Sequence, residues 1–82
     1  MPEPIFTSHA RDMLKERDIP EEWVLQAVKN PDTKSAGADE NTHYFKSIPE
    51  RGNRVLHVIV NETVQPNRIV TLFLDKRARR AK

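Results

Sequence analysis

Two strand-like segments near the carboxyl end of the chain constrain the fold most strongly. Residues 54–62 and 68–75 are rich in Val, Ile and Leu, and only residues 63–67 separate them. Parallel strands need a crossover of about a dozen residues or more, so this short connection predicts an antiparallel hairpin. Residues 42–48 predict a weaker third strand, which the turn at 49–53 joins to the hairpin.

Two helices are predicted ahead of the strands. The first covers residues 9–17, where the hydroxyl of Thr7 or Ser8 can accept a backbone N–H of the first turn. The second begins at Pro20-Glu21-Glu22, because proline suits a first turn and carboxylates favour the positive end of the helix dipole. Asn30-Pro31-Asp32 ends this second helix.

The segments together predict an α+β domain over residues 1–75, with two N-terminal helices packed on a three- to four-stranded antiparallel sheet in the order ααβββ. The small polar residues 33–41 predict an exposed loop. No apolar run approaches the roughly 20 residues of a membrane helix, and no signal peptide opens the chain. We therefore expect a single cytoplasmic domain with no membrane partner.

Strict alternation divides the hairpin into two faces. The aliphatic face, which we expect the helices to cover, holds Leu56, Val58, Val60, Val70, Leu72 and Leu74. The opposite, mixed face holds Val55, His57, Ile59, Ile69, Thr71 and Phe73. Two helices cannot easily cover both sides of a sheet, so the mixed face is expected to bind a ligand, a second copy of the chain or the tail.

Charge is distributed unevenly along the chain. Residues 1–40 contain 5 Lys/Arg and 9 Asp/Glu, whereas residues 41–82 contain 9 Lys/Arg and 3 Asp/Glu. Five of those nine cations lie in residues 76–82, which we expect to form a flexible basic tail. Such a cluster attracts phosphates whatever the base sequence, although a solvated terminus that aids solubility explains it equally well.

Several classes of site are excluded or disfavoured. The chain has no Cys, so it forms neither disulfides nor Cys-based zinc sites. His9, His43 and His57 are too far apart in sequence to show metal-ligand spacing, and we expect no metal and no cofactor. Gly37 and Gly52 are the only glycines, so there is no glycine-rich phosphate loop.

A few residues nevertheless have the chemistry of a phosphate-cleaving site. An imidazole has an ordinary pKa near 6.5, so His9 can take and return a proton at neutral pH. Arg54 opens the central strand, and a guanidinium can bind phosphate through two parallel hydrogen bonds. His57 and Thr71 share the mixed face. Each of these residues is also explained by an ordinary structural role, as a surface, strand or packing side chain.

The order of several short motifs resembles a small bacterial family of uncharacterised domains. These motifs are Phe6-Thr7-Ser8-His9-Ala10, Met13, Arg17-Asp18-Ile19, Asn30-Pro31-Asp32 and the strands 54–60 and 69–72. The resemblance covers residues 5–75. That family looks like a branch of the barnase, colicin and RelE-like ribonuclease toxins, in which two helices precede an antiparallel sheet. The chain departs from the pattern at Asp12-Met13, where an Arg-Met pair is usual, and at Pro20, where a serine often caps the second helix.

The resemblance implies a metal-independent endoribonuclease of a toxin–antitoxin system. The 2′-OH of RNA would attack the adjacent phosphate, with His9, Arg54 and Thr71 as catalytic residues and His57 as an additional candidate. The side chains expected to bind the RNA backbone are Arg17, Lys46, Arg77, Arg79 and Arg80. The implied partners are RNA, in some relatives on the ribosome, and an antitoxin protein. If the first helix covers the aliphatic face, His9 and Thr71 meet only where the helix tip reaches around an edge of the sheet.

Two other classes of function are consistent with the same residues. The mixed face and the basic tail would hold RNA, DNA or a protein without chemistry, or Val55, Ile59, Ile69 and Phe73 would form a homodimer surface. A steep salt dependence of RNA affinity would favour binding through the basic half of the chain. A dimer that is insensitive to salt would favour the apolar interface.

Overall fold

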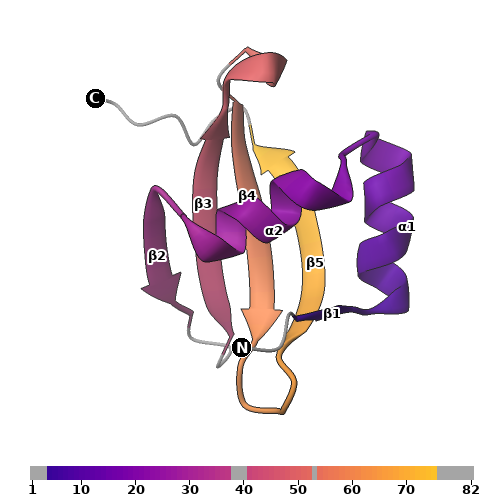
Figure 1. Ribbon diagram of the computed structural model, residues 1–82, viewed down its shortest axis with the longest axis vertical. Helices are drawn as coiled ribbons and strands as arrows, with labels where there is room; N and C mark the ends of the chain where they lie inside the picture. Colours follow the sequence, from indigo (N-terminus) through magenta and orange to yellow (C-terminus); the bar gives the residue numbers. More distant parts are fainter. Residues whose placement is uncertain (1–3, 38–40, 53, 76–82) are drawn as a thin grey trace.

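The computed structural model describes residues 4–37, 41–52 and 54–75 (Figure 1). Two helices, α1 (Ser8–Arg17) and α2 (Glu21–Lys29), accompany a five-stranded mixed sheet. The strands are β1 (Ile5–Phe6), β2 (Thr33–Ala36), β3 (Thr42–Ile48), β4 (Arg54–Asn61) and β5 (Arg68–Asp75), in the spatial order β1-β5-β4-β3-β2. A 3-10 turn, η1 (Pro49–Arg51), joins β3 to β4.

The two predicted helices are confirmed, and local residues explain their ends. The Thr7 hydroxyl accepts the N–H of Ala10 at 3.1 Å and so caps α1. Asp18 ends α1 in the left-handed conformation, with φ at 54°. Glu21 and Glu22 lie in the first turn of α2, where their charge is favourable, and Asn30 follows its last residue.

The antiparallel strands β3, β4 and β5 are confirmed, but the sheet is larger than predicted. Residues 33–36 form the edge strand β2 rather than a loop, and β1 pairs with β5 in parallel. Neither extra strand has a sequence pattern that reveals it. All four residues of β2 are exposed, so they show no alternation of polarity, and β1 has only two residues. The sheet is therefore mixed rather than wholly antiparallel.

The helices take different positions on the sheet. α2 crosses one face and contacts β3 and β4, whereas α1 stands beside β5 at the edge (Figure 1). The buried core between sheet and helices comprises Phe6, Ala10, Ile19, Val24, Ala27, Tyr44, Ile48, Leu56, Val58, Val60, Ile69 and Leu72. Because α1 packs at the edge, its first turn can approach the other face of the sheet.

A β-bulge in the β4–β5 ladder changes which side chains face the core. Ile59 pairs with Thr71 but Val60 pairs with Ile69, so Val70 is the additional residue. Ile69 is fully buried in the core, and Val70 is not a core residue. The prediction that Val70 faces the helices and Ile69 the mixed face was therefore wrong, because strict alternation does not allow for an inserted residue.

Two further predictions concern membrane insertion and the basic tail. Within the described ranges, no helix is both long enough and apolar enough to cross a membrane. The expected basic tail at 76–82 lies outside the described residues, and with it Arg77, Arg79 and Arg80.

Candidate functional site

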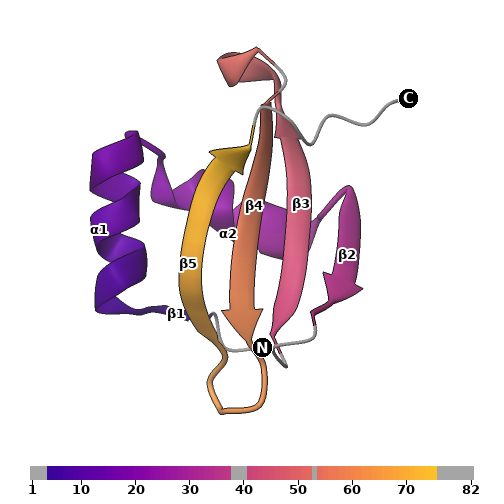
Figure 2. The same ribbon diagram turned by 180° about the vertical axis from the view of Figure 1, so that it is seen from behind.

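The helix-free face is the face of the sheet that neither helix crosses (Figure 2). The pairing of β3, β4 and β5 arranges its side chains in rows across the strands. One row is Phe45, His57 and Phe73, the next is His43, Ile59 and Thr71, and the third includes Asn61 and Arg68. Both histidines of the sheet and the predicted Thr71 therefore share one surface.

The third histidine reaches this surface from α1. His9 lies in the first turn of the helix, and its Nε2 is 3.1 Å from the Thr71 hydroxyl oxygen, within hydrogen-bond distance. His9 is exposed and Thr71 is half-buried. The structure thus brings together two of the three predicted catalytic residues, which are 62 positions apart in the chain.

Thr7 fixes the start of α1 to the bulge of β5. Its hydroxyl lies 3.0 Å from the carbonyl oxygen of Ile69 and 3.1 Å from that of Val70, and it donates to these two oxygens. Its backbone N–H also donates to Ile69 at 3.2 Å. The hydroxyl that caps α1 therefore also binds the irregular segment just before Thr71. This double attachment is what aligns His9 with Thr71.

His43 and His57 form a second hydrogen-bonded pair on the helix-free face. Nδ1 of His43 is 2.8 Å from Nε2 of His57, and both rings are half-buried. A hydrogen bond between two imidazoles needs one N–H and one lone pair, so the two facing nitrogens cannot both carry protons. The contact therefore holds one N–H between the two rings.

Two phenylalanines hold the ring of His57 between them. The centroid of the His57 ring lies 4.3 Å from that of Phe45 and 4.7 Å from that of Phe73. The ring planes are tilted by 35° and 51°, within the range of favourable aromatic contacts. His57 therefore occupies the centre of an aromatic row that spans three strands.

Three of the predicted residues lie elsewhere. Arg54 is at the opposite end of β4, five residues from Ile59 and so about 17 Å along the strand. It shares the helix-covered face with Leu56, and the structure does not bring it to His9 and Thr71. Arg17 is in the last turn of α1, about 12 Å along the helix from His9. Lys46 donates to the carbonyl of Asn30 at 3.0 Å on the helix-covered face, where it ties β3 to the end of α2.

His43 and Arg68 are two residues of this face that the sequence does not reveal as site residues. β3 pairs with β4 so that Phe45 lies directly opposite His57, and His43 is then the diagonal neighbour of His57. The sequence of one strand does not reveal its register with the next strand, so this contact could not be predicted. Arg68 is placed beside Asn61 on the helix-free face by the bulge. Strict alternation would assign Arg68 to the core side, so only the bulge makes it a neighbour of this surface.

A buried tyrosine fixes β3 from the other side of the sheet. The Tyr44 hydroxyl donates a hydrogen bond to Oε2 of Glu62, and the Thr42 hydroxyl donates to Oε1 at 2.9 Å. Burial first, and then the hydrogen bond and charge of Glu62, raise the pKa of Tyr44 to about 12. Tyr44 therefore stays neutral over the physiological range and holds the strand that carries His43 and Phe45.

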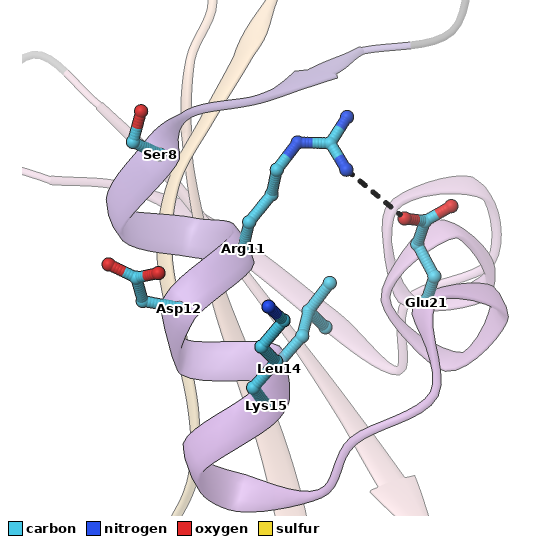
Figure 3. A pocket seen from close by; sticks show the side chains of 6 residues that line it. All are labelled: Ser8, Arg11, Asp12, Leu14, Lys15 and Glu21. Atoms are coloured by element: carbon cyan, nitrogen blue, oxygen red, sulfur yellow. Dashed lines mark ion pairs between the residues drawn. The ribbon is translucent and has the colours of Figure 1, made fainter.

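A separate hollow lies between α1 and the start of α2 (Figure 3). Its lining residues are Ser8, Arg11, Asp12, Leu14, Lys15 and Glu21. Arg11 reaches across it to Glu21 at 4.0 Å, an exposed ion pair that contributes little to stability. None of the paired histidines lines this hollow. In the described ranges, no three His, Asp or Glu side chains are grouped so that they could hold a metal ion.

Comparison with known proteins identifies one protein family. Residues 6–74 match the family described as a domain of unknown function, DUF4258. Neither a curated protein sequence nor a solved structure is significantly similar to the chain. The matched range includes His9, His43, His57, Arg68 and Thr71, and it ends before the basic segment 76–82.

Proposed function

The chain belongs to the DUF4258 family, and on that premise we propose that it is a metal-independent endoribonuclease whose site lies on the helix-free face. One observation carries the proposal: His9 contacts Thr71 at the edge of this face, and the other two histidines form a hydrogen-bonded pair on the same face. Cleavage of RNA without a metal needs one group that removes a proton and another that returns it, and histidines meet both needs near neutral pH.

The reaction is an internal displacement at phosphorus. The 2′-oxygen forms a bond to the adjacent phosphorus, a base takes the proton of the 2′-OH, and the bond to the 5′-oxygen of the next nucleotide breaks. An acid gives that leaving oxygen a proton. The products are a 2′,3′-cyclic phosphate and a 5′-OH end, so atoms and charges balance without a co-reactant.

His9 is the proposed base. Thr71 holds Nε2 of the ring at 3.1 Å, which leaves Nδ1 as the atom that accepts the proton of the 2′-OH. Thr71 fixes the orientation of His9 and is positioned to donate its hydroxyl to a phosphate oxygen when substrate enters. His9 also lies in the first turn of α1, where the helix dipole favours an anionic group.

The His43–His57 pair is the proposed source of the returning proton. His57 and Thr71 are diagonal neighbours across β4 and β5, a spacing of about 7–8 Å between backbones. For His57 to return the proton, the leaving oxygen of the substrate would lie within about 3 Å of a nitrogen of its ring. Through the hydrogen bond between the two rings, His43 would pass a proton to His57 after His57 has given one to the leaving oxygen.

Arg68 is the cation we propose for phosphate binding. It is exposed and lies on the same face as Thr71, whereas Arg54 lies on the other face at the far end of the sheet. In the toxin–antitoxin setting that the sequence suggests, an antitoxin would act by covering the helix-free face. The basic segment 76–82 would add non-specific affinity for the RNA backbone.

The test is cleavage of RNA in a translating cell extract that contains ribosomes. The wild type should yield discrete fragments with 5′-OH and cyclic phosphate ends, and these fragments should be lost in His9→Asn and in His57→Asn. A positioned acid or base contributes about 10²–10⁴ to the rate, so the loss should be of that size. Lys15→Gln, on the outer surface of α1, is the matched control and should cleave like the wild type.

The outcomes separate the proposal from its rivals. Intact RNA with the folded wild-type protein would exclude the ribonuclease and favour a binding module or a dimer. Cleavage that persists in both histidine variants would mean that the activity does not use this face. Circular dichroism of each variant establishes that it is folded before its activity is compared.

A further inference from the structure

An aromatic row lies on the helix-free face beside the proposed site. Phe45, His57 and Phe73 come from three neighbouring strands and lie side by side in one row. The row spans two strand spacings, about 10 Å, which is wide enough for one or two unpaired bases. Phe45 and Phe73 are only half-buried, although no helix covers them. Aromatic side chains on adjacent strands of an open sheet face are a common way to stack single-stranded RNA.

We propose that this row stacks unpaired nucleobases of single-stranded RNA and so defines the substrate class of the proposed ribonuclease. The inference rests on the proposed function, because the row directly adjoins His43 and Thr71. Phe73 is two residues from Thr71 on β5, so a base stacked on Phe73 would hold its own phosphate near Thr71. Double-stranded RNA cannot bind in this way, because its bases are already stacked on one another.

Charge complementarity favours RNA as the occupant over a second copy of the chain. The rows that hold His57, Thr71 and Arg68 contain no acidic residue on β3, β4 or β5, and Asp75 belongs to the next row of this face, opposite Val55. A twofold dimer through this face would bring two copies of Arg68 into one interface, and these three rows offer no carboxylate to pair with them. Juxtaposed like charges disfavour such an interface, whereas they attract a polyanion. The polar His43, Asn61 and Thr71 suit the sugar–phosphate backbone beside the stacked bases.

The test measures binding separately from cleavage. A fluorescein-labelled 2′-O-methyl RNA oligonucleotide lacks the attacking hydroxyl, so it binds without being cleaved. Its affinity is measured by anisotropy and compared with that of an abasic oligonucleotide of equal length, which keeps the phosphates but has no bases. Stacking contributes about 1–3 kcal/mol per base, so the wild type should prefer the intact oligonucleotide by roughly five- to a hundredfold.

The variants Phe45→Leu and Phe73→Leu identify the row as the source of that preference. Each should reduce the ratio of intact to abasic affinity by at least about fivefold, while binding of the abasic oligonucleotide stays unchanged. Trp23→Leu removes an aromatic ring from α2 on the helix-covered side, and it is the matched control that should keep the ratio. Thermal melts establish that all three variants are folded.

Three results would overturn the inference. The first is equal affinity of the wild type for intact and abasic oligonucleotides, and the second is a preference for the intact oligonucleotide that persists in both Phe variants. The third is a wild-type dimer in analytical ultracentrifugation that Phe73→Leu dissociates. The result for the enzyme is independent. If the protein binds intact RNA better than abasic RNA but does not cleave ordinary RNA, base stacking is supported and the ribonuclease is rejected. If it cleaves RNA but binds intact and abasic oligonucleotides equally, the ribonuclease is supported and base stacking is rejected.

Discussion

Tyr44 shows how a single side chain can report on the folded state. It is buried, and its hydroxyl donates to Glu62, so its pKa is raised to about 12 from the ordinary value of 10.0. The folded protein therefore favours the neutral phenol more than the unfolded chain does. This contribution to stability is fully present below pH 10, and it is lost as the pH rises from 10 through about 12.

Absorbance can follow this titration directly, because the chain contains one tyrosine. The tyrosinate signal of the folded protein should have its midpoint near pH 12, and urea should lower that midpoint towards 10. The free energy of unfolding of the wild type should also fall more steeply between pH 10 and 12 than that of Tyr44→Phe. A midpoint near 10 in the folded protein would show that Tyr44 is neither buried nor bonded to Glu62.

At the scale of elements, the junction between β1 and α1 decides where His9 lies. The Thr7 side chain caps α1 and also bonds the carbonyls of the β5 bulge, so one residue connects a helix to a strand distant in sequence. β1 adds parallel pairing with the same part of β5. The His9–Thr71 contact is a consequence of this junction rather than of α1 alone.

Replacing the Thr7 hydroxyl tests this junction. Thr7→Val keeps the shape of the side chain but removes the cap and the bond to β5, so the free energy of unfolding should fall by about 0.5–2 kcal/mol. RNA cleavage should fall as well, because His9 is no longer aligned. Thr7→Ser retains the hydroxyl and is the matched control. Urea denaturation measures both variants, and equal stability of Thr7→Val and the wild type would contradict the assignment.

The sequence predicted the elements that carry a strong local signal. The caps at Thr7 and Asn30 delimit the helices, and alternation of apolar residues delimits β4 and β5. β1 and β2 depend on pairing with distant strands, so a local pattern does not reveal them. The bulge at Val70 also depends on pairing, which is why the faces of Ile69 and Arg68 were not predictable.

The candidate site depends on the arrangement of the whole molecule. His9 and Thr71 were candidates from their chemistry, a family resemblance implied their roles, and they meet because α1 stands at the edge of the sheet. The same resemblance suggested Arg54, which the sheet places about 17 Å along β4 from the row of Thr71. His43 could not be selected from the sequence, because its partnership with His57 follows from the register of two strands.

Salt dependence provides a test of how charge is arranged on the helix-free face. Affinity for RNA falls as the salt concentration rises, and each phosphate contact made by a cation adds about one to the magnitude of the slope of log affinity against log salt concentration. Arg68→Gln should therefore reduce the magnitude of this slope by about one for the 2′-O-methyl oligonucleotide. Lys15→Gln makes the same change of charge on α1 and should leave the slope unaltered. Identical slopes in the wild type and Arg68→Gln would exclude Arg68 from phosphate binding.

The parallel pairing of β1 with β5 also has a consequence for how the protein is made. A ribosome releases residues 5–9 long before residues 68–71, and β1 has no partner strand until β5 has emerged. Thr7 likewise finds the carbonyls of Ile69 and Val70 only at that time. A nascent chain that stops before Thr71 therefore cannot assemble the His9–Thr71 contact. Synthesis itself delays the assembly of this contact until the last strand of the sheet is in place.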